Sequence, residues 1–237
     1  MKTAVLALTM LALMGCSKGP FAQIEEGKAF TQLDSLPVPY RKDAWKTLRW
    51  INLDAKPMTK DGGACTGHAG LIERDSDHQH LLVLGAVCGG TVLTTSSGDR
   101  LEAHALKTMG QGDKLTLEAR FVEVMEPGVY ALWTTTDVLF ENDREKSVMR
   151  DNTALRRRDN QLSKLFELGN EGVLENGFEG DTFPRTFVLR SAREEQLIVF
   201  DPNENRYAHK SYRTFTPDGG APAADAGSAD ASAATGP

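Results

Sequence analysis

The sequence lacks an excess of positive charge. Its 237 residues include 27 Lys and Arg against 33 Asp and Glu, which gives a formal net charge of -6. Proteins that bind nucleic acid are usually strongly basic, because they must neutralise phosphates. The charge balance therefore argues against nucleic acid as a partner.

The sequence also lacks the short motifs of the common enzyme classes. It contains no G-x-S-x-G, S-x-x-K, H-E-x-x-H or C-x-x-C string and no phosphate-binding glycine loop. Catalytic groups can still come together from distant positions in the chain, so the absence of motifs only lowers the expectation of an enzyme. We expect a non-catalytic protein that needs no cofactor.

The apolar stretch at the start of the chain is too short to span a bilayer as a helix. Residues 4–14 are apolar except for Thr9, and they follow the positively charged start Met1-Lys2. This length is typical of the apolar region of a secretory signal peptide. We therefore predict that residues 1–15 are a signal peptide.

The end of this stretch, Leu13-Met14-Gly15-Cys16, resembles the lipobox of bacterial lipoproteins. The resemblance covers only about the first 20 residues, and the mature domain resembles no family. It implies cleavage before Cys16 and three acyl chains on that residue, which hold a protein stably on a membrane. Because Ser17 rather than aspartate follows, it also implies the periplasmic face of the outer membrane of a Gram-negative cell. The alternative is an ordinary signal peptide with a chance cysteine.

Cysteines are scarce, and their number fits this interpretation. Lipid on Cys16 leaves Cys65 and Cys88 as a pair, and the periplasm is oxidising. The alternative is two unrelated buried thiols.

The segment between these two cysteines predicts a β-hairpin. Polar residues 75–78 separate two apolar runs, and a turn centred on Ser76-Asp77 places Cys65 opposite Cys88. The same register gives one apolar face, because side chains alternate along a strand. The other facing pairs are Gly67 with Ala86, Ala69 with Leu84, and Leu71 with Leu82. A two-residue turn would put the cysteines at a hydrogen-bonded pair, where Cα atoms are farther apart, so we expect a bulge or a wider turn.

The rest of the chain predicts a mainly β protein with one helix, an α+β fold. Residues 66–141 alternate like five or six antiparallel strands, which indicates a small barrel or sandwich with an outline similar to an OB fold. Leu155, Leu162, Leu165 and Phe166 form one stripe of a helix predicted over 153–168. Strands are expected at 186–190, 196–200 and 207–215, joined as two hairpins.

These patterns divide the chain into five regions. A lipid anchor and tether at 16–40 precedes a disulfide-containing β domain at 41–141, in which residues 43–51 form a short helix or lead into the first strand. Region 142–216, the helix and hairpins, is either a separate domain or part of the same one. Residues 217–237 contain only Ala, Gly, Ser, Thr, Pro and Asp, so we expect a disordered tail.

Three clusters could carry chemistry, and each has a simpler alternative. His78, His80, Glu73 and Asp75 could hold zinc, or form the solvated tip of a hairpin. Four carboxylates could hold calcium, or form an acidic loop. Three consecutive arginines with Lys164 could meet an anionic lipid or an acidic partner, or form the polar face of the helix. The carboxylates are Glu171, Glu175, Glu179 and Asp181, and the arginines are Arg156, Arg157 and Arg158.

The sequence therefore favours a membrane-anchored periplasmic lipoprotein that binds a protein or another envelope component without catalysis. One alternative is an immunity lipoprotein that neutralises a secreted antibacterial toxin. Another is a metal-dependent hydrolase. A pocket lined by convergent polar groups would favour a small ligand or catalysis, whereas a flat apolar face would favour a protein partner.

Overall fold

The computed structural model describes residues 20–21, 23–95, 101–106, 114–141 and 146–214. The predicted signal peptide, Cys16, the turn at 97–98, the loop at 110–113 and the tail at 217–237 lie outside the described residues. Within the described ranges, no helix has both the length and the apolar character needed to cross a membrane.

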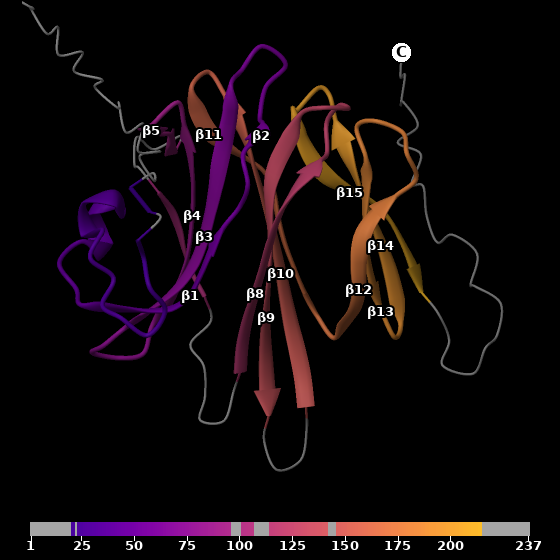
Figure 1. The fold of residues 1–237 in the computed structure, drawn as a ribbon. Helices are drawn as coiled ribbons and strands as arrows, with labels where there is room; N and C mark the ends of the chain where they lie inside the picture. Colours follow the sequence, from indigo (N-terminus) through magenta and orange to yellow (C-terminus); the bar gives the residue numbers. More distant parts are fainter. Residues whose placement is uncertain (1–19, 22, 96–100, 107–113, 142–145, 215–237) are drawn as a thin grey trace, which may run out of the picture.

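The described chain folds into three β-sheets, which Figure 1 shows side by side. Sheet A has the order β1-β3-β4-β5, with β2 beside β3 and β7 beside β4; sheet B has the order β6-β11-β10-β9-β8; sheet C has the order β12-β13-β14-β15. All pairings are antiparallel except that of the short β6 with β11. The strands are β1 (Trp45–Asn52), β2 (Lys56–Pro57), β3 (Ala64–Arg74), β4 (His80–Cys88), β5 (Thr91–Val92), β6 (Thr94–Thr95), β7 (Glu102–Ala105), β8 (Lys114–Glu123), β9 (Tyr130–Glu141), β10 (Lys146–Arg158), β11 (Gln161–Glu171), β12 (Val173–Glu179), β13 (Thr186–Ser191), β14 (Glu194–Asp201) and β15 (Arg206–Thr214).

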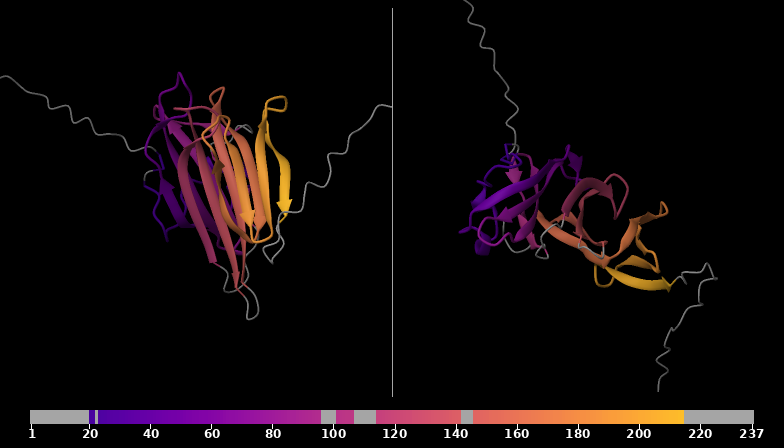
Figure 2. Two further views of the ribbon diagram at one scale, coloured as in Figure 1. Left: turned by 90° about the vertical axis from the view of Figure 1, so that its right-hand side faces the viewer. Right: turned by 90° about the horizontal axis from the view of Figure 1, so that it is seen from below.

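Sheet B is the middle layer and is apolar on both faces. Its residues Leu132 and Leu155 pack with Leu71 and Leu84 of sheet A, whereas Trp133 on the opposite face packs in a second core with the rings of sheet C. Figure 2, seen from below, shows that sheet B is strongly curved between its two neighbours. The arrangement is a layered, sandwich-like β fold, and the sheets of the described residues do not close into a barrel. The OB-like outline is not confirmed.

The predicted hairpin is confirmed in β3 and β4, with Cys65 paired to Cys88 and Leu71 to Leu82. The loop is wider than two residues, because the N–H of Arg74 donates to the carbonyl of Gln79. This shift by one position makes Cys65 and Cys88 a non-hydrogen-bonded pair, whose Cα atoms are 4.2 Å apart. The wider turn removes the geometric conflict, and the cysteines are placed to form a disulfide.

The helix predicted over 153–168 is wrong, because this segment forms the hairpin of β10 and β11. Asp159 and Asn160 have positive φ angles of 50° and 61°. A two-residue turn with two positive φ angles matches the twist of the strands on either side, and Asp and Asn tolerate it better than most residues. The apolar residues form a stripe at helical spacing, but the turn places them on two strands.

The tether predicted for residues 16–40 is too long. Phe21, Phe30 and Leu36 are almost completely buried against the outer face of sheet A, in a segment that also contains the short 3-10 turns η1 (Leu33–Ser35) and η2 (Val38–Tyr40). This covering turns sheet A into a layer that is buried on both faces. Phe21, Phe30 and Leu36 therefore belong to the folded body.

The other strand predictions agree with the structure. Residues 43–51 lead into the strand β1, and both C-terminal hairpins are present, as β13 with β14 and β14 with β15.

The glycine-rich stretch after residue 169 was not expected to contain a strand, but β12 forms there. Gly172, with a φ angle of +64°, lies between β11 of sheet B and β12 of sheet C. Strands from both sides of residue 141 pair within sheet B, so the two predicted regions share a sheet.

Candidate functional site

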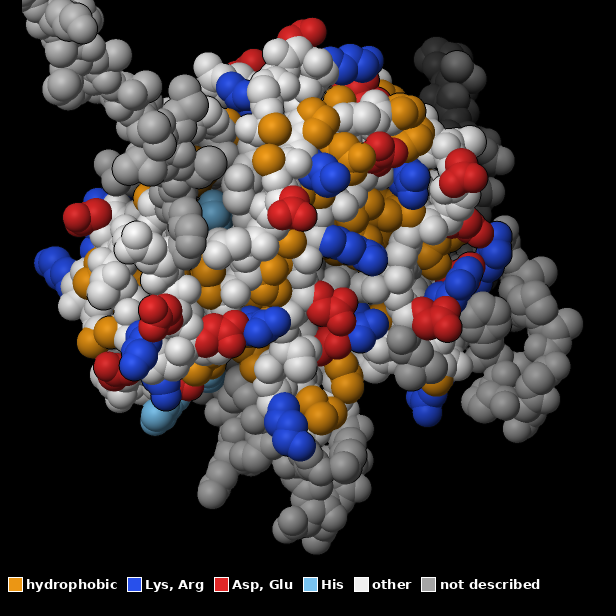
Figure 3. Space-filling view, in the orientation of Figure 1, with side chains coloured by type: hydrophobic (Ala, Val, Ile, Leu, Met, Phe, Trp, Pro, Cys, Tyr) orange, Lys and Arg blue, Asp and Glu red, His pale blue; other side chains and the backbone are white. Residues whose placement is uncertain are grey.

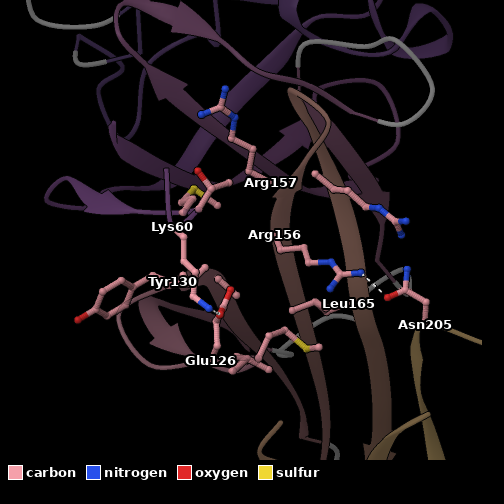
Figure 4. A pocket seen from close by; sticks show the side chains of 14 residues that line it. Lys60, Glu126, Tyr130, Arg156, Arg157, Leu165 and Asn205 are labelled. Carbon is pink, nitrogen blue, oxygen red and sulfur yellow. Dashed lines mark hydrogen bonds and ion pairs between the residues drawn. The ribbon is translucent and has the colours of Figure 1, made fainter. Parts of the chain in front are cut away.

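A pocket of about 290 Å³ lies where the three sheets come together at one end of the body. It is built from the loop after β2, the β8–β9 turn, the ends of β10 and β11, and the β14–β15 turn (Figure 4). We call it the basic pocket. Its lining residues are Met58, Thr59, Lys60, Val124, Met125, Glu126, Val129, Tyr130, Ala131, Arg156, Arg157, Arg158, Leu165 and Asn205. Figure 3 shows Lys and Arg side chains beside exposed hydrophobic ones on the upper part of this face.

Arg156 is a half-buried cation that has no counter-ion among the described residues. Its guanidinium donates to the side-chain oxygen of Asn205 at 2.9 Å, which is a neutral partner. The Nε atom is buried and has no hydrogen-bond partner among the described residues. Burial lowers the pKa of Arg156 below its ordinary value, and repulsion from Arg158 lowers that pKa further. The guanidinium therefore has unused hydrogen-bonding capacity inside the pocket.

The neighbouring arginines also leave positive charge uncompensated. Arg157 donates to the amide oxygen of Asn160, and Nε of Arg158 lies 3.7 Å from the exposed carboxylate of Asp159. Lys60 is paired with Glu126, the one carboxylate among the residues that line the pocket. Four cations and one anion thus line a pocket in a chain whose net charge is negative.

Arginines elsewhere in the described structure have partners of different kinds. Arg150, on the same strand as Arg156, donates to both oxygens of Asp137 at 2.6 and 2.7 Å. Arg185, in contrast, lies over two phenylalanine rings, and its Nε atom also has no hydrogen-bond partner among the described residues. Arg156 and Arg157 therefore differ from Arg150 in that each donates to a neutral asparagine.

The candidate metal site is only partly assembled. Nδ1 of His78 and Nε2 of His80 lie 3.0 and 3.1 Å from the two carboxylate oxygens of Glu73, and these contacts lower the pKa of that carboxyl, the His78 hydrogen bond most. Asp75 was expected opposite His78, but both lie in the wider loop. In the parts of the chain that are described, no three His, Cys, Asp or Glu side chains are arranged to hold a metal ion.

The acidic stretch at 171–181 does not form a calcium site within the described residues. Glu175 and Glu179 lie on β12 and line a second pocket of about 280 Å³ with Arg190, whose guanidinium pairs with Glu175 at 3.6 Å. Arg190 also pairs with Glu195 at 2.5 Å, which raises the pKa of the guanidinium. These charges compensate one another on the surface of sheet C.

A second charged cluster joins sheets A and B. His104 on β7 lies 2.9 Å from Glu102 and 3.3 Å from Glu167 of β11, and Lys164 also contacts Glu102 at 3.3 Å. These contacts run between β7 and β11, so the cluster links the two sheets, and Lys164 is matched by a carboxylate.

His68 has a structural role in the core under the N-terminal segment. It packs against Phe21 and Trp50, and its Nδ1 donates to the side-chain oxygen of Asn52 at 2.7 Å. Its Nε2 is buried without a hydrogen-bond partner among the described residues. A proton on Nε2 would be buried without an acceptor, and burial lowers the pKa of His68 to about 4.

This burial predicts a loss of stability in mild acid. Unfolded His68 binds a proton near pH 6.5, whereas the folded side chain stays neutral until about pH 4. The stability that the buried, neutral His68 contributes is fully present above pH 6.5 and is lost as the pH falls toward 4. The loss amounts to about 2 kcal/mol by pH 5. Urea unfolding at pH 7 and pH 5 should show this loss in the wild type. His68→Gln, which can still donate to Asn52, should reduce it; an equal loss in the variant would contradict the assignment.

Sequence reasoning named the three arginines but placed them on a helix. On that helix they would point in different directions, which made a shared site improbable. Lys60, Glu126 and Asn205 were not predicted as site residues, since they come from three separate turns. The tryptophans Trp45, Trp50 and Trp133 are buried in the cores, whereas Tyr130 lines the pocket.

Comparisons with known proteins found no matching family model, no matching curated protein and no matching solved structure.

Proposed function

We propose that this chain is a lipid-anchored envelope protein that binds, without catalysis, a component carrying an anionic group. The observation that supports this most is the half-buried Arg156 guanidinium, which has a neutral partner and an unpaired Nε. A buried charge without a counter-ion lowers stability, so such a residue is typically retained for a ligand.

The chemistry of the basic pocket suits an oxyanion. A guanidinium presents its N–H donors in a planar fork that matches two oxygens of a carboxylate or phosphate. Pairing with an anion would also relieve the repulsion between Arg156 and Arg158. Burial strengthens this pairing, because the contact is less screened than on an open surface.

The composition of the pocket supports binding over catalysis. The described residues of its lining include no Ser, Cys or His, which are common nucleophiles and general bases. The single carboxylate, Glu126, is paired with Lys60. The described surface also has few exposed large hydrophobic side chains, namely Val38 and Tyr212, so the pocket supports the proposal better than a flat apolar interface does.

The membrane location is supported by the lipobox resemblance at Leu13-Met14-Gly15-Cys16. Only residues 17–20 separate Cys16 from the buried Phe21, so an acylated Cys16 would hold the body close to the bilayer. Mass spectrometry of the membrane fraction should find acyl chains on Cys16. An unmodified Cys16 in a soluble fraction would contradict the anchor but not the binding site.

Calorimetric titration with inorganic phosphate tests the binding site. The protein is the mature chain from residue 16 on, with Cys16→Ser so that no detergent is needed. We expect saturable binding that weakens as sodium chloride is added, since added ions screen the guanidinium charges. A heat signal no larger than that of chloride at equal ionic strength would contradict the proposal.

Glu126→Gln should strengthen anion binding. The substitution removes the carboxylate that competes for Lys60, and the gain expected from one partly exposed ion pair is about threefold in affinity. Phosphate titration of this variant measures the change. Glu123→Gln is the matched control, because Glu123 lies on the same hairpin but does not line the pocket. Equal effects of both changes would point to net charge alone and would count against a specific role for Glu126.

A further inference from the structure

One side of the basic pocket is apolar, and its floor belongs to the two cores. Met58 belongs to the core between sheets A and B, whereas Val124, Ala131 and Leu165 belong to the core between sheets B and C. All four are at most 2% exposed. Around them lie Met125, Val129 and the ring of Tyr130, which are half-buried. The pocket thus gives access to apolar surface from both cores.

The cations and the apolar side chains come from different elements. The three arginines come from the end of β10 and Lys60 from the loop after β2, whereas most of the apolar lining comes from the β8–β9 hairpin (Figure 4). An inorganic ion would pair with Arg156 but leave the apolar wall in contact with water. A ligand with an apolar chain beside its charge would cover both parts, and burial of each methylene strengthens binding.

The volume limits the length of this chain. At about 30 Å³ for each non-hydrogen atom, a pocket of about 290 Å³ has room for about ten such atoms. This corresponds to a carboxylate with a chain of about eight carbons. The two methionines in the lining suit such a ligand, because their flexible side chains adapt to a linear chain.

We infer that the basic pocket holds a single-chain amphiphile whose anionic head, a carboxylate or phosphate, pairs with Arg156 while its apolar chain lies against the β8–β9 side. The inference rests on the proposed function and adds the class of ligand. The lipid anchor would keep the pocket beside a source of such molecules.

The experiment compares five probes on the mature chain with Cys16→Ser: octanoate, pentyl phosphate, acetate, inorganic phosphate and octanol, each below its micelle concentration or solubility limit. We expect octanoate and pentyl phosphate to bind at least tenfold more tightly than acetate and inorganic phosphate, because burial of a few methylenes gives this factor. Octanol, which has the same chain length as octanoate but no charge, should bind much more weakly than octanoate.

The outcomes separate this inference from the proposed function. If the short anions bind as tightly as octanoate and pentyl phosphate, the chain has no place in the pocket and the inference fails, while the anion site stands. If octanol binds as tightly as octanoate, or if no anion binds, both proposals fail.

A conservative variant tests the apolar wall directly. Val129→Thr keeps the shape of the side chain and adds a hydroxyl group, and the site is half-buried, so the fold should tolerate it. We expect octanoate affinity to fall about threefold or more, because a polar group then faces the chain. Val38→Thr, at a position 65% exposed, is the control. An unchanged octanoate affinity in Val129→Thr would overturn the placement of the chain.

Discussion

Replacing Arg156 by methionine should weaken anion binding by about 30-fold or more without loss of stability. A charge-assisted hydrogen bond contributes roughly 1.5–3 kcal/mol, and Arg156 supplies the half-buried donors of the pocket. Methionine keeps much of the side-chain length but removes the charge, so the desolvation of a guanidinium no longer opposes folding. Titration with octanoate measures the binding, and urea unfolding measures the stability.

Arg150→Met is the matched control on the same strand. Arg150 donates to both oxygens of Asp137, so its loss leaves a partly buried carboxylate unpaired. We expect this variant to lose about 1–3 kcal/mol of stability and to bind anions like the wild type. The two arginines should therefore give opposite results. If Arg156→Met loses as much stability as Arg150→Met and binds octanoate normally, Arg156 has a structural role and the proposed site is wrong.

Loss of the cysteine pair should be the largest single change in stability. Cys65 and Cys88 are 23 positions apart, and a cross-link that closes a loop of this size stabilises a protein by about 3 kcal/mol. The pair also holds together the ends of β3 and β4, which form the centre of sheet A. The double variant Cys65→Ala with Cys88→Ala should show this loss in urea unfolding at pH 7.

A reducing agent provides an independent measurement of the same effect. The wild type in excess dithiothreitol should approach the stability of the double variant, and dithiothreitol should not change the double variant further. If the unfolding midpoint of the wild type is the same with and without the reductant, the two sulfur atoms are not joined in the protein. The proposal that the protein resides in an oxidising compartment would then lose one of its supports.

The β3–β4 hairpin could be predicted in register because its determinants are local. Alternation of apolar residues, a polar loop and two cysteines at matching positions all specify the same pairing. The choice between a bulge and a wider turn was left open, because it depends on hydrogen bonds around Arg74 and Gln79. The segment 153–168 shows the opposite case. Its apolar spacing fits a helix, and only the positive φ angles of Asp159 and Asn160 decide for a hairpin.

The covering of sheet A by residues 21–40 also escaped prediction. The described residues of this segment are helical only in two short 3-10 turns, at Leu33–Ser35 and Val38–Tyr40, but lack of regular secondary structure is not lack of order. Phe21, Phe30 and Leu36 bury their side chains against strands that come later in the chain. A segment of this kind is stabilised by tertiary contacts, which cannot be inferred from the spacing of apolar residues in the sequence.

The sequence by itself determined the mainly β class, the Cys65–Cys88 register and most of the strands, because side-chain alternation and turn residues act over short distances. Only the tertiary structure decided that there are three layers and that Lys60, Glu126, Arg156 and Asn205 surround one pocket. These residues come from turns far apart in the chain, and their meeting depends on how curved sheets pack on one another. The lack of a carboxylate beside Arg156 is likewise a property of that packing, since the sequence is rich in acids.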